Sequence, residues 1–84
     1  MQFRYCPQDV CSTEILFELD EDHTLRNLYF AGGCSGNLAG IAKLTRGMKA
    51  EDIIERLRGT PCGSNPTSCP DQLAKALTQA LQQL

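Results

Sequence analysis

The sequence lacks any long apolar run, and no stretch approaches the roughly 20 residues that a membrane-spanning helix needs. The opening residues, 1–7, do not have the pattern of a secretory signal peptide. An excess of one charge is also missing, because eight Lys and Arg stand against ten Asp and Glu, a net charge of -2. A surface that binds nucleic acid or anionic lipid would need a basic excess. We therefore expect a cytoplasmic protein with no membrane and no nucleic-acid partner.

Motifs of self-contained enzymes are also missing. There is no glycine-rich phosphate loop followed by Lys-Ser/Thr, no Gly-x-Ser-x-Gly and no Cys-His pair at a supporting spacing. The short C-x2-C pair of a zinc finger is absent as well. The sequence thus predicts no catalytic residues of its own, and any site would have to be assembled by the fold.

The chain is short but unusually rich in cysteine. Its 84 residues, 42% of them hydrophobic, predict one globular domain over residues 1–84. A core of this size rarely supplies more than about 3–5 kcal/mol, so a metal, a disulfide or a partner chain would add needed stability. Because the cytoplasm keeps thiols reduced, the five cysteines favour metal binding or redox work over a disulfide framework.

The first half of the chain has the alternating pattern of β-strands. Residues 12–20 place Ile15, Phe17 and Leu19 on one face, and residues 25–31 form a second strand after a polar turn at residues 20–23. Phe3 and Tyr5 begin a shorter strand that Pro7 stops. These patterns predict a three-stranded antiparallel sheet made of an N-terminal strand and a hairpin.

The second half has the period of helices. We predict helices over residues 38–45, ended by Gly47, over residues 50–58, and over residues 70–84. The last begins with Pro70 and Asp71 and places leucines on one face, with Gln, Lys and Thr outside. Strands followed by helices predict an α+β fold, with the three helices packed on one face of the sheet.

Four of the cysteines lie beside turns or helix starts. Cys34 follows two glycines and precedes a helix, Cys69 is placed at the N-cap of the last helix, and Cys11 and Cys62 lie in turns. The partial positive charge at a helix N-terminus favours thiolate, which is both the metal ligand and the nucleophile. A single cysteine is more often a small core residue, but the set of four favours chemistry. His23, in an acidic turn, is expected to be solvated.

Several stretches of the sequence resemble the TSCPD domain family. Thr67-Ser68-Cys69-Pro70-Asp71 spells its signature, and three further stretches match in order: residues 10–12, residues 32–38 and residues 59–63. The likeness runs from about residue 3 to residue 82. A similar module occurs at the C-terminus of some cobalamin-dependent ribonucleotide reductases. The resemblance implies an accessory role in ribonucleoside-diphosphate reduction and deoxynucleotide supply, with a reductase as partner. The four cysteines carry over, and Cys6 has no counterpart.

A weaker resemblance is to the fold of iron–sulfur cluster scaffolds, in which a hairpin ends in Gly-Cys and a cysteine loop opens the last helix. Here these positions are Gly33-Cys34 and Cys69-Pro70-Asp71. That scaffold's remaining cysteine lies between strands, whereas Cys11 precedes the first long strand.

Four hypotheses follow. The leading one is a zinc site of Cys11, Cys34, Cys62 and Cys69. The alternatives are a thiol-redox pair of Cys62 and Cys69, an iron–sulfur carrier, and a structural role with buried cysteines and a homodimer through the last helix.

Overall fold

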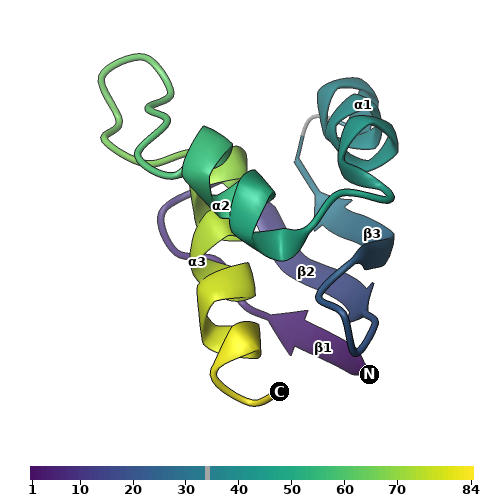
Figure 1. Cartoon of the computed structure of the whole chain (residues 1–84). Helices are drawn as coiled ribbons and strands as arrows, with labels where there is room; N and C mark the ends of the chain where they lie inside the picture. The colour runs from purple at the N-terminus through teal and green to yellow at the C-terminus, as the bar shows by residue number, and fades with distance from the viewer. Residues whose placement is uncertain (34) are drawn as a thin grey trace.

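Three strands followed by three helices make up the computed structural model, which describes residues 1–33 and 35–84. The strands are β1 (Gln2–Tyr5), β2 (Ser12–Leu19) and β3 (Leu25–Gly32), and the helices are α1 (Ser35–Thr45), α2 (Ala50–Leu57) and α3 (Cys69–Leu81). The arrangement confirms the predicted α+β class and the predicted order of elements (Figure 1).

The sheet is antiparallel with the strand order β1-β2-β3. Its inner face follows from the alternation along β2, since Ile15, Phe17 and Leu19 are all buried. On the opposite face Leu16 lies beside Tyr29 of β3, and both side chains are exposed. The alternating residues of β2 therefore separate a core face from a solvent face.

The helices cover the core face of the sheet. Helix α1 packs on β3, α3 packs on β2, and α2 packs on α3 (Figure 1). The buried apolar residues of all six elements except β1 form one core, to which Phe3 of β1 adds a ring stacked on Phe17 at 5.3 Å between centroids. In Figure 1 the connection between α2 and α3 projects from this core at the upper left.

The tip of the β2–β3 hairpin is joined to the connection between α1 and α2. The amide of Leu25 donates to the carbonyl of Met48, and the amide of Ala50 donates to the carbonyl of His23. The imidazole of His23 pairs with the carboxylate of Glu51, and this hydrogen bond is the main cause of the lowered pKa of Glu51. His23, whose side chain is 36% exposed, thus acts as a hydrogen-bond partner of Glu51 at the surface.

Helix α3 differs from its prediction at both ends. It begins at Cys69 rather than Pro70 and ends at Leu81, and Leu84 is 46% exposed. Gln72, expected on the outer face with the other polar residues, is only 2% exposed. Helical periodicity gave the leucine face correctly. It could not show that the N-terminal segment also contacts α3, where the amide of Gln8 donates to the side chain of Gln72.

Across residues 1–33 and 35–84, none of the helices has the length and apolar character needed to cross a membrane.

Candidate thiol and metal site

The start of α3 is built by hydrogen bonds from the residues around Cys69. Ser68 is the N-cap, with its hydroxyl accepting from the amide of Asp71 at 3.2 Å and donating to the carbonyl of Thr60 at 2.6 Å. This corrects the expectation that Cys69 is the N-cap. Because a serine hydroxyl satisfies an unpaired amide of the first turn better than a thiol does, the cap falls on Ser68, and Cys69 becomes the first helical residue. Its side chain is 7% exposed.

Asp71 closes the loop that connects α2 to α3. Its carboxylate accepts from the amide of Gly59 at 2.6 Å and from the hydroxyl of Thr67 at 2.6 Å, so one side chain holds both ends of the loop. The hydrogen bond from Thr67 contributes most to lowering the pKa of Asp71; the Gly59 amide and Lys75 add to it, while burial opposes it. We call residues 59–68 the cysteine loop, because they carry Cys62.

Gln72 connects the same region to the N-terminal segment. Its side-chain oxygen accepts from the amide of Gln8 at 3.0 Å, and its side-chain nitrogen donates to the hydroxyl of Thr67 at 2.9 Å. Sequence analysis missed this residue, because a glutamine within a helix is usually solvated. In the sequence, only its place directly after the Thr67–Asp71 signature could have indicated a structural role for Gln72.

The structure brings Cys11 and Cys69 together. Their sulfurs lie 4.0 Å apart, although the residues are separated by 58 positions in the chain. The hydroxyl of Ser12, the first residue of β2, lies 3.1 Å from the sulfur of Cys69. Cys11 is exposed and Cys69 is buried, so the pair has one accessible and one sheltered thiol.

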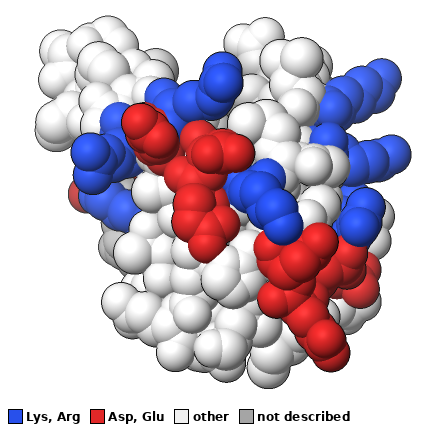
Figure 2. Space-filling view, viewed as in Figure 1, with Lys and Arg blue, Asp and Glu red and all other residues white. Residues whose placement is uncertain are grey.

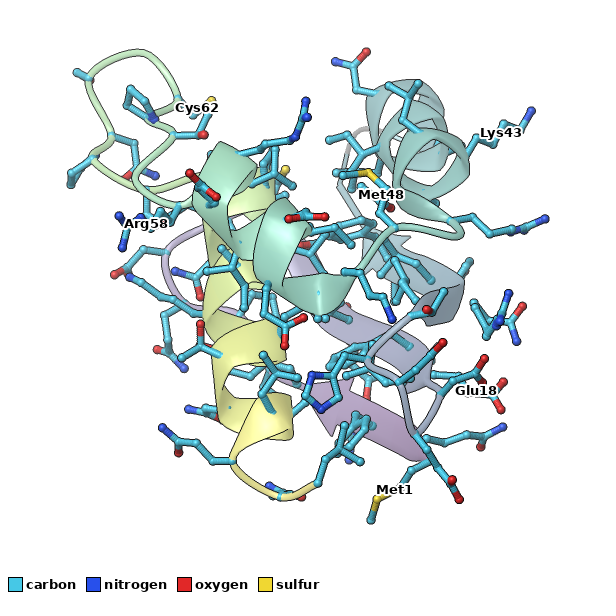
Figure 3. The ribbon with its side chains drawn as sticks, in the orientation of Figure 1. Met1, Glu18, Lys43, Met48, Arg58 and Cys62 are labelled. Atoms are coloured by element: carbon cyan, nitrogen blue, oxygen red, sulfur yellow. The ribbon has the colours of Figure 1, made fainter. Side chains whose placement is uncertain are left out.

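Cys62 lies within a tight turn of the cysteine loop. Its amide donates to the carbonyl of Asn65 at 3.0 Å, the reverse bond is 2.9 Å, and Gly63 between them has φ +58°. The side-chain amide of Asn65 donates to the carbonyl of Asp9 at 2.8 Å and so connects the turn to the segment that carries Cys11. Figure 3 shows the exposed Cys62 on this projecting loop.

The predicted ligand Cys34 lies outside the described residues. The residue before it, Gly33, lies against the thiol site, since a Cβ added there would lie 3.2 Å from the sulfur of Cys11 and 3.0 Å from the Cδ1 atom of Leu38. The start of β2 and the residue after β3 therefore approach closely enough that a Cβ at this position would be crowded.

Cys11, Cys62 and Cys69 line one pocket of about 920 Å³. Its walls come from the segment before β2, from one face of α1, from the cysteine loop and from the first residues of α3. Apart from these thiols its lining is mostly apolar, with Leu38, Ile41 and Pro61 among its residues. Figure 2 shows a hollow in the upper outline of the molecule, between two lobes that carry few charged residues.

Three of the four predicted ligands thus reach one pocket, but they are not gathered around one point. In residues 1–33 and 35–84, no three side chains of His, Cys, Asp or Glu are grouped closely enough to hold a metal ion. Cys6 is exposed and does not line the pocket, and His23 lies at the hairpin tip.

The comparisons with known proteins identify the family. The profile of the TSCPD domain matches residues 1–81, which is nearly the whole chain. The chain belongs to the TSCPD domain family. In this member, three of the five signature residues support Cys69: Ser68 caps the helix, while Asp71 accepts from Thr67 and so fixes the loop on one side of Cys69. The comparisons with curated proteins and with solved structures found no significant match to the chain.

Proposed function

We propose that this TSCPD domain is a metal-binding module in which Cys11, Cys34, Cys62 and Cys69 hold a zinc ion. The observation that carries the proposal is the 4.0 Å separation of the Cys11 and Cys69 sulfurs. Two thiolates of a tetrahedral zinc site, each about 2.3 Å from the metal, lie about 3.8 Å apart. The pair therefore has the spacing of two zinc ligands.

Cys62 is supported by its place in the structure, and Cys34, which lies outside the described residues, by the residue that precedes it in the sequence. Cys62 lines the same pocket as the pair, and Cys34 directly follows Gly33, which lies against the sulfur of Cys11. A structural zinc ion would join the end of β3, the start of β2 and the cysteine loop, and its binding free energy would add to a small core.

Elemental analysis of protein purified without chelator tests the proposal. We expect about one zinc per chain, and we expect EDTA to lower the midpoint of thermal unfolding, because binding to the folded state alone stabilises it. C11S and C69S should lose the metal, whereas C6S, an exposed cysteine outside the pocket, should keep it. Metal far below one equivalent, together with an EDTA-insensitive midpoint, would rule the zinc site out.

An iron–sulfur cluster uses the same type of ligand, so the metal itself needs a control. Anaerobic purification should give a colourless protein if zinc is the resident metal. A brown protein with visible charge-transfer absorption, and with iron in place of zinc, would assign the cysteines to a cluster instead.

We propose further that the module is an accessory of ribonucleoside-diphosphate reduction in the cytoplasm. Membership of the TSCPD family supports this role, because the family resemblance extends to the C-terminal modules of some cobalamin-dependent ribonucleotide reductases. Adding the chain to such a reductase from which the C-terminal module has been deleted should increase deoxynucleotide formation. The C69S variant should not increase deoxynucleotide formation. If the unaltered chain has no effect either, the proposed role is contradicted.

A further inference from the structure

The Cys11–Cys69 pair has a property that zinc binding does not require, namely a strong difference in access between its two thiols. Cys11 is exposed at the pocket, whereas Cys69 is 7% exposed and has the Ser12 hydroxyl 3.1 Å from its sulfur. We propose that these two residues form a dithiol–disulfide exchange site for low-molecular-weight disulfides, with Cys11 as the attacking thiol and Cys69 as the resolving thiol.

Access decides the order of the two steps. In the first step the thiolate of Cys11, its proton released to solvent, attacks one sulfur of a disulfide RSSR. The S–S bond of RSSR breaks, a mixed disulfide forms at Cys11, and one RS⁻ leaves and takes up a proton. A bulky disulfide would approach the sulfur of Cys69 less readily, because that residue is only 7% exposed.

The second step is intramolecular. Cys69 loses its proton and attacks the sulfur of Cys11, a Cys11–Cys69 bond forms, and the second RS⁻ leaves and is protonated. In sum, the two protein thiols are oxidised by two electrons and RSSR is reduced to two RSH. An excess of RSH drives the reverse reaction.

The geometry requires only a local movement. The sulfurs must approach from 4.0 Å to the roughly 2.05 Å of a disulfide. Cys69 is fixed in the first turn of α3 by its neighbours, whereas Cys11 lies in the irregular segment between β1 and β2. We therefore assign the movement to Cys11.

This assignment replaces one partner of the redox pair expected from the sequence. Cys62 and Cys69 are close in sequence, but Cys62 is held in the turn with Asn65, whereas Cys69 lies in the first turn of α3. Among the described cysteines, the structure records a sulfur–sulfur contact for Cys11 with Cys69 only.

Oxidised glutathione is the probe for the experiment, and the protein is the full chain, reduced, stripped of metal with EDTA and desalted. Trypsin leaves Cys6 with Cys11 in residues 5–26, and Cys62 with Cys69 in residues 59–75. The variant C6S/C62S, which changes two exposed residues, therefore makes the crosslinked peptides unambiguous. We expect mass spectrometry to show the loss of two hydrogens and a link between residues 5–26 and residues 59–75.

Two further variants separate the roles of the thiols. C6S/C62S/C69S should accumulate a mixed disulfide with glutathione at Cys11, because the resolving thiol is missing. C6S/C62S/C11S should form one at Cys69 at least about tenfold more slowly, because that thiol is buried. Circular dichroism serves as the control that each variant is folded.

A link from residues 27–43, which carry Cys34, to either peptide in place of the expected one would overturn the proposal, as would equal rates at Cys11 and Cys69. Should C69S fail to fold, the link found in C6S/C62S still decides between the pairs. The exchange needs both sulfurs free of metal, so the experiment uses metal-free protein, and the zinc content measured before stripping tests the zinc proposal separately.

Discussion

Gly33 shows how a single residue makes room for the thiol site. Its backbone has φ +76°, a left-handed conformation that costs a residue with a Cβ about 1–2 kcal/mol. A Cβ there would also lie within 3.0–3.3 Å of Leu38, Cys11 and the amide of Ser12. The conformation therefore favours glycine next to the sulfur of Cys11, and the space leaves little room for a Cβ.

We predict that G33A lowers the free energy of unfolding by roughly 2 kcal/mol, since backbone strain and crowding add. It should also weaken metal binding, because Cys11 must move away from the new methyl group. Urea unfolding and zinc titration measure the two effects.

G40A is the matched control for this prediction. Gly40 also lines the pocket, but it lies within α1, and an added Cβ would meet nothing within 4 Å. A better helix former should stabilise the chain by about 0.5–1 kcal/mol. Equal losses in the two variants would show that the space around Gly33 is not the cause.

At the scale of elements, the start of α3 and the cysteine loop form one unit. Ser68, Thr67 and Asp71 exchange hydrogen bonds within the unit, and Gln72 connects it to the N-terminal segment. A loop without regular structure is held by side chains at its two ends, and the position of Cys62 depends on them.

We predict that D71N lowers the free energy of unfolding at neutral pH by about 1–3 kcal/mol, because it removes a buried charged acceptor. The folded-state pKa of Asp71 is lowered, so the carboxylate stabilises the chain above the ordinary carboxyl range. That contribution disappears as the pH falls through the lowered folded-state pKa. Urea unfolding of metal-free protein at a series of pH values measures this. The free energies of unfolding of D71N and of the unaltered chain should converge in acid.

D52N is the control, since Asp52 is the third residue of α2 as Asp71 is of α3. Both aspartates interact with a helix dipole, but Asp52 is exposed. The control should therefore lose less than about 1 kcal/mol. A loss as large as that of D71N would mean that the helix dipole, rather than the hydrogen bonds to the loop, explains the effect.

At the scale of the whole molecule, one core supports both the sheet and the site. Leu73 and Leu77 of α3 are fully buried against β2 and α2, so these two leucines of the predicted apolar face pack within the chain. The first turn of the same helix carries Cys69, and the packing of α3 therefore positions the buried thiol.

We predict that L77A lowers the free energy of unfolding by about 2–5 kcal/mol, because it leaves a cavity between α3 and its neighbours. L44A removes the same atoms from a residue that is 79% exposed and should change stability by less than about 0.5 kcal/mol. Thermal and urea unfolding compare the two. A small loss in L77A would contradict the packing described for α3.

The strand pairing and the helix order could be predicted from local patterns, because alternation along β2 and helical periodicity each involve residues close in sequence. The N-cap was misplaced by one residue, since Ser68 and Cys69 both fit a helix start and hydrogen bonding decides between them. Gln72 and Asn65 were missed, because their partners Gln8 and Asp9 are more than fifty residues away.

The sequence by itself determined the α+β class, the family and the set of cysteines worth testing. Only the tertiary structure decided that Cys11 and Cys69, 58 positions apart, meet at 4.0 Å with one thiol exposed and the other buried. The physical reason is that local patterns specify which face of an element is apolar. The distance between two loops depends on how the elements pack.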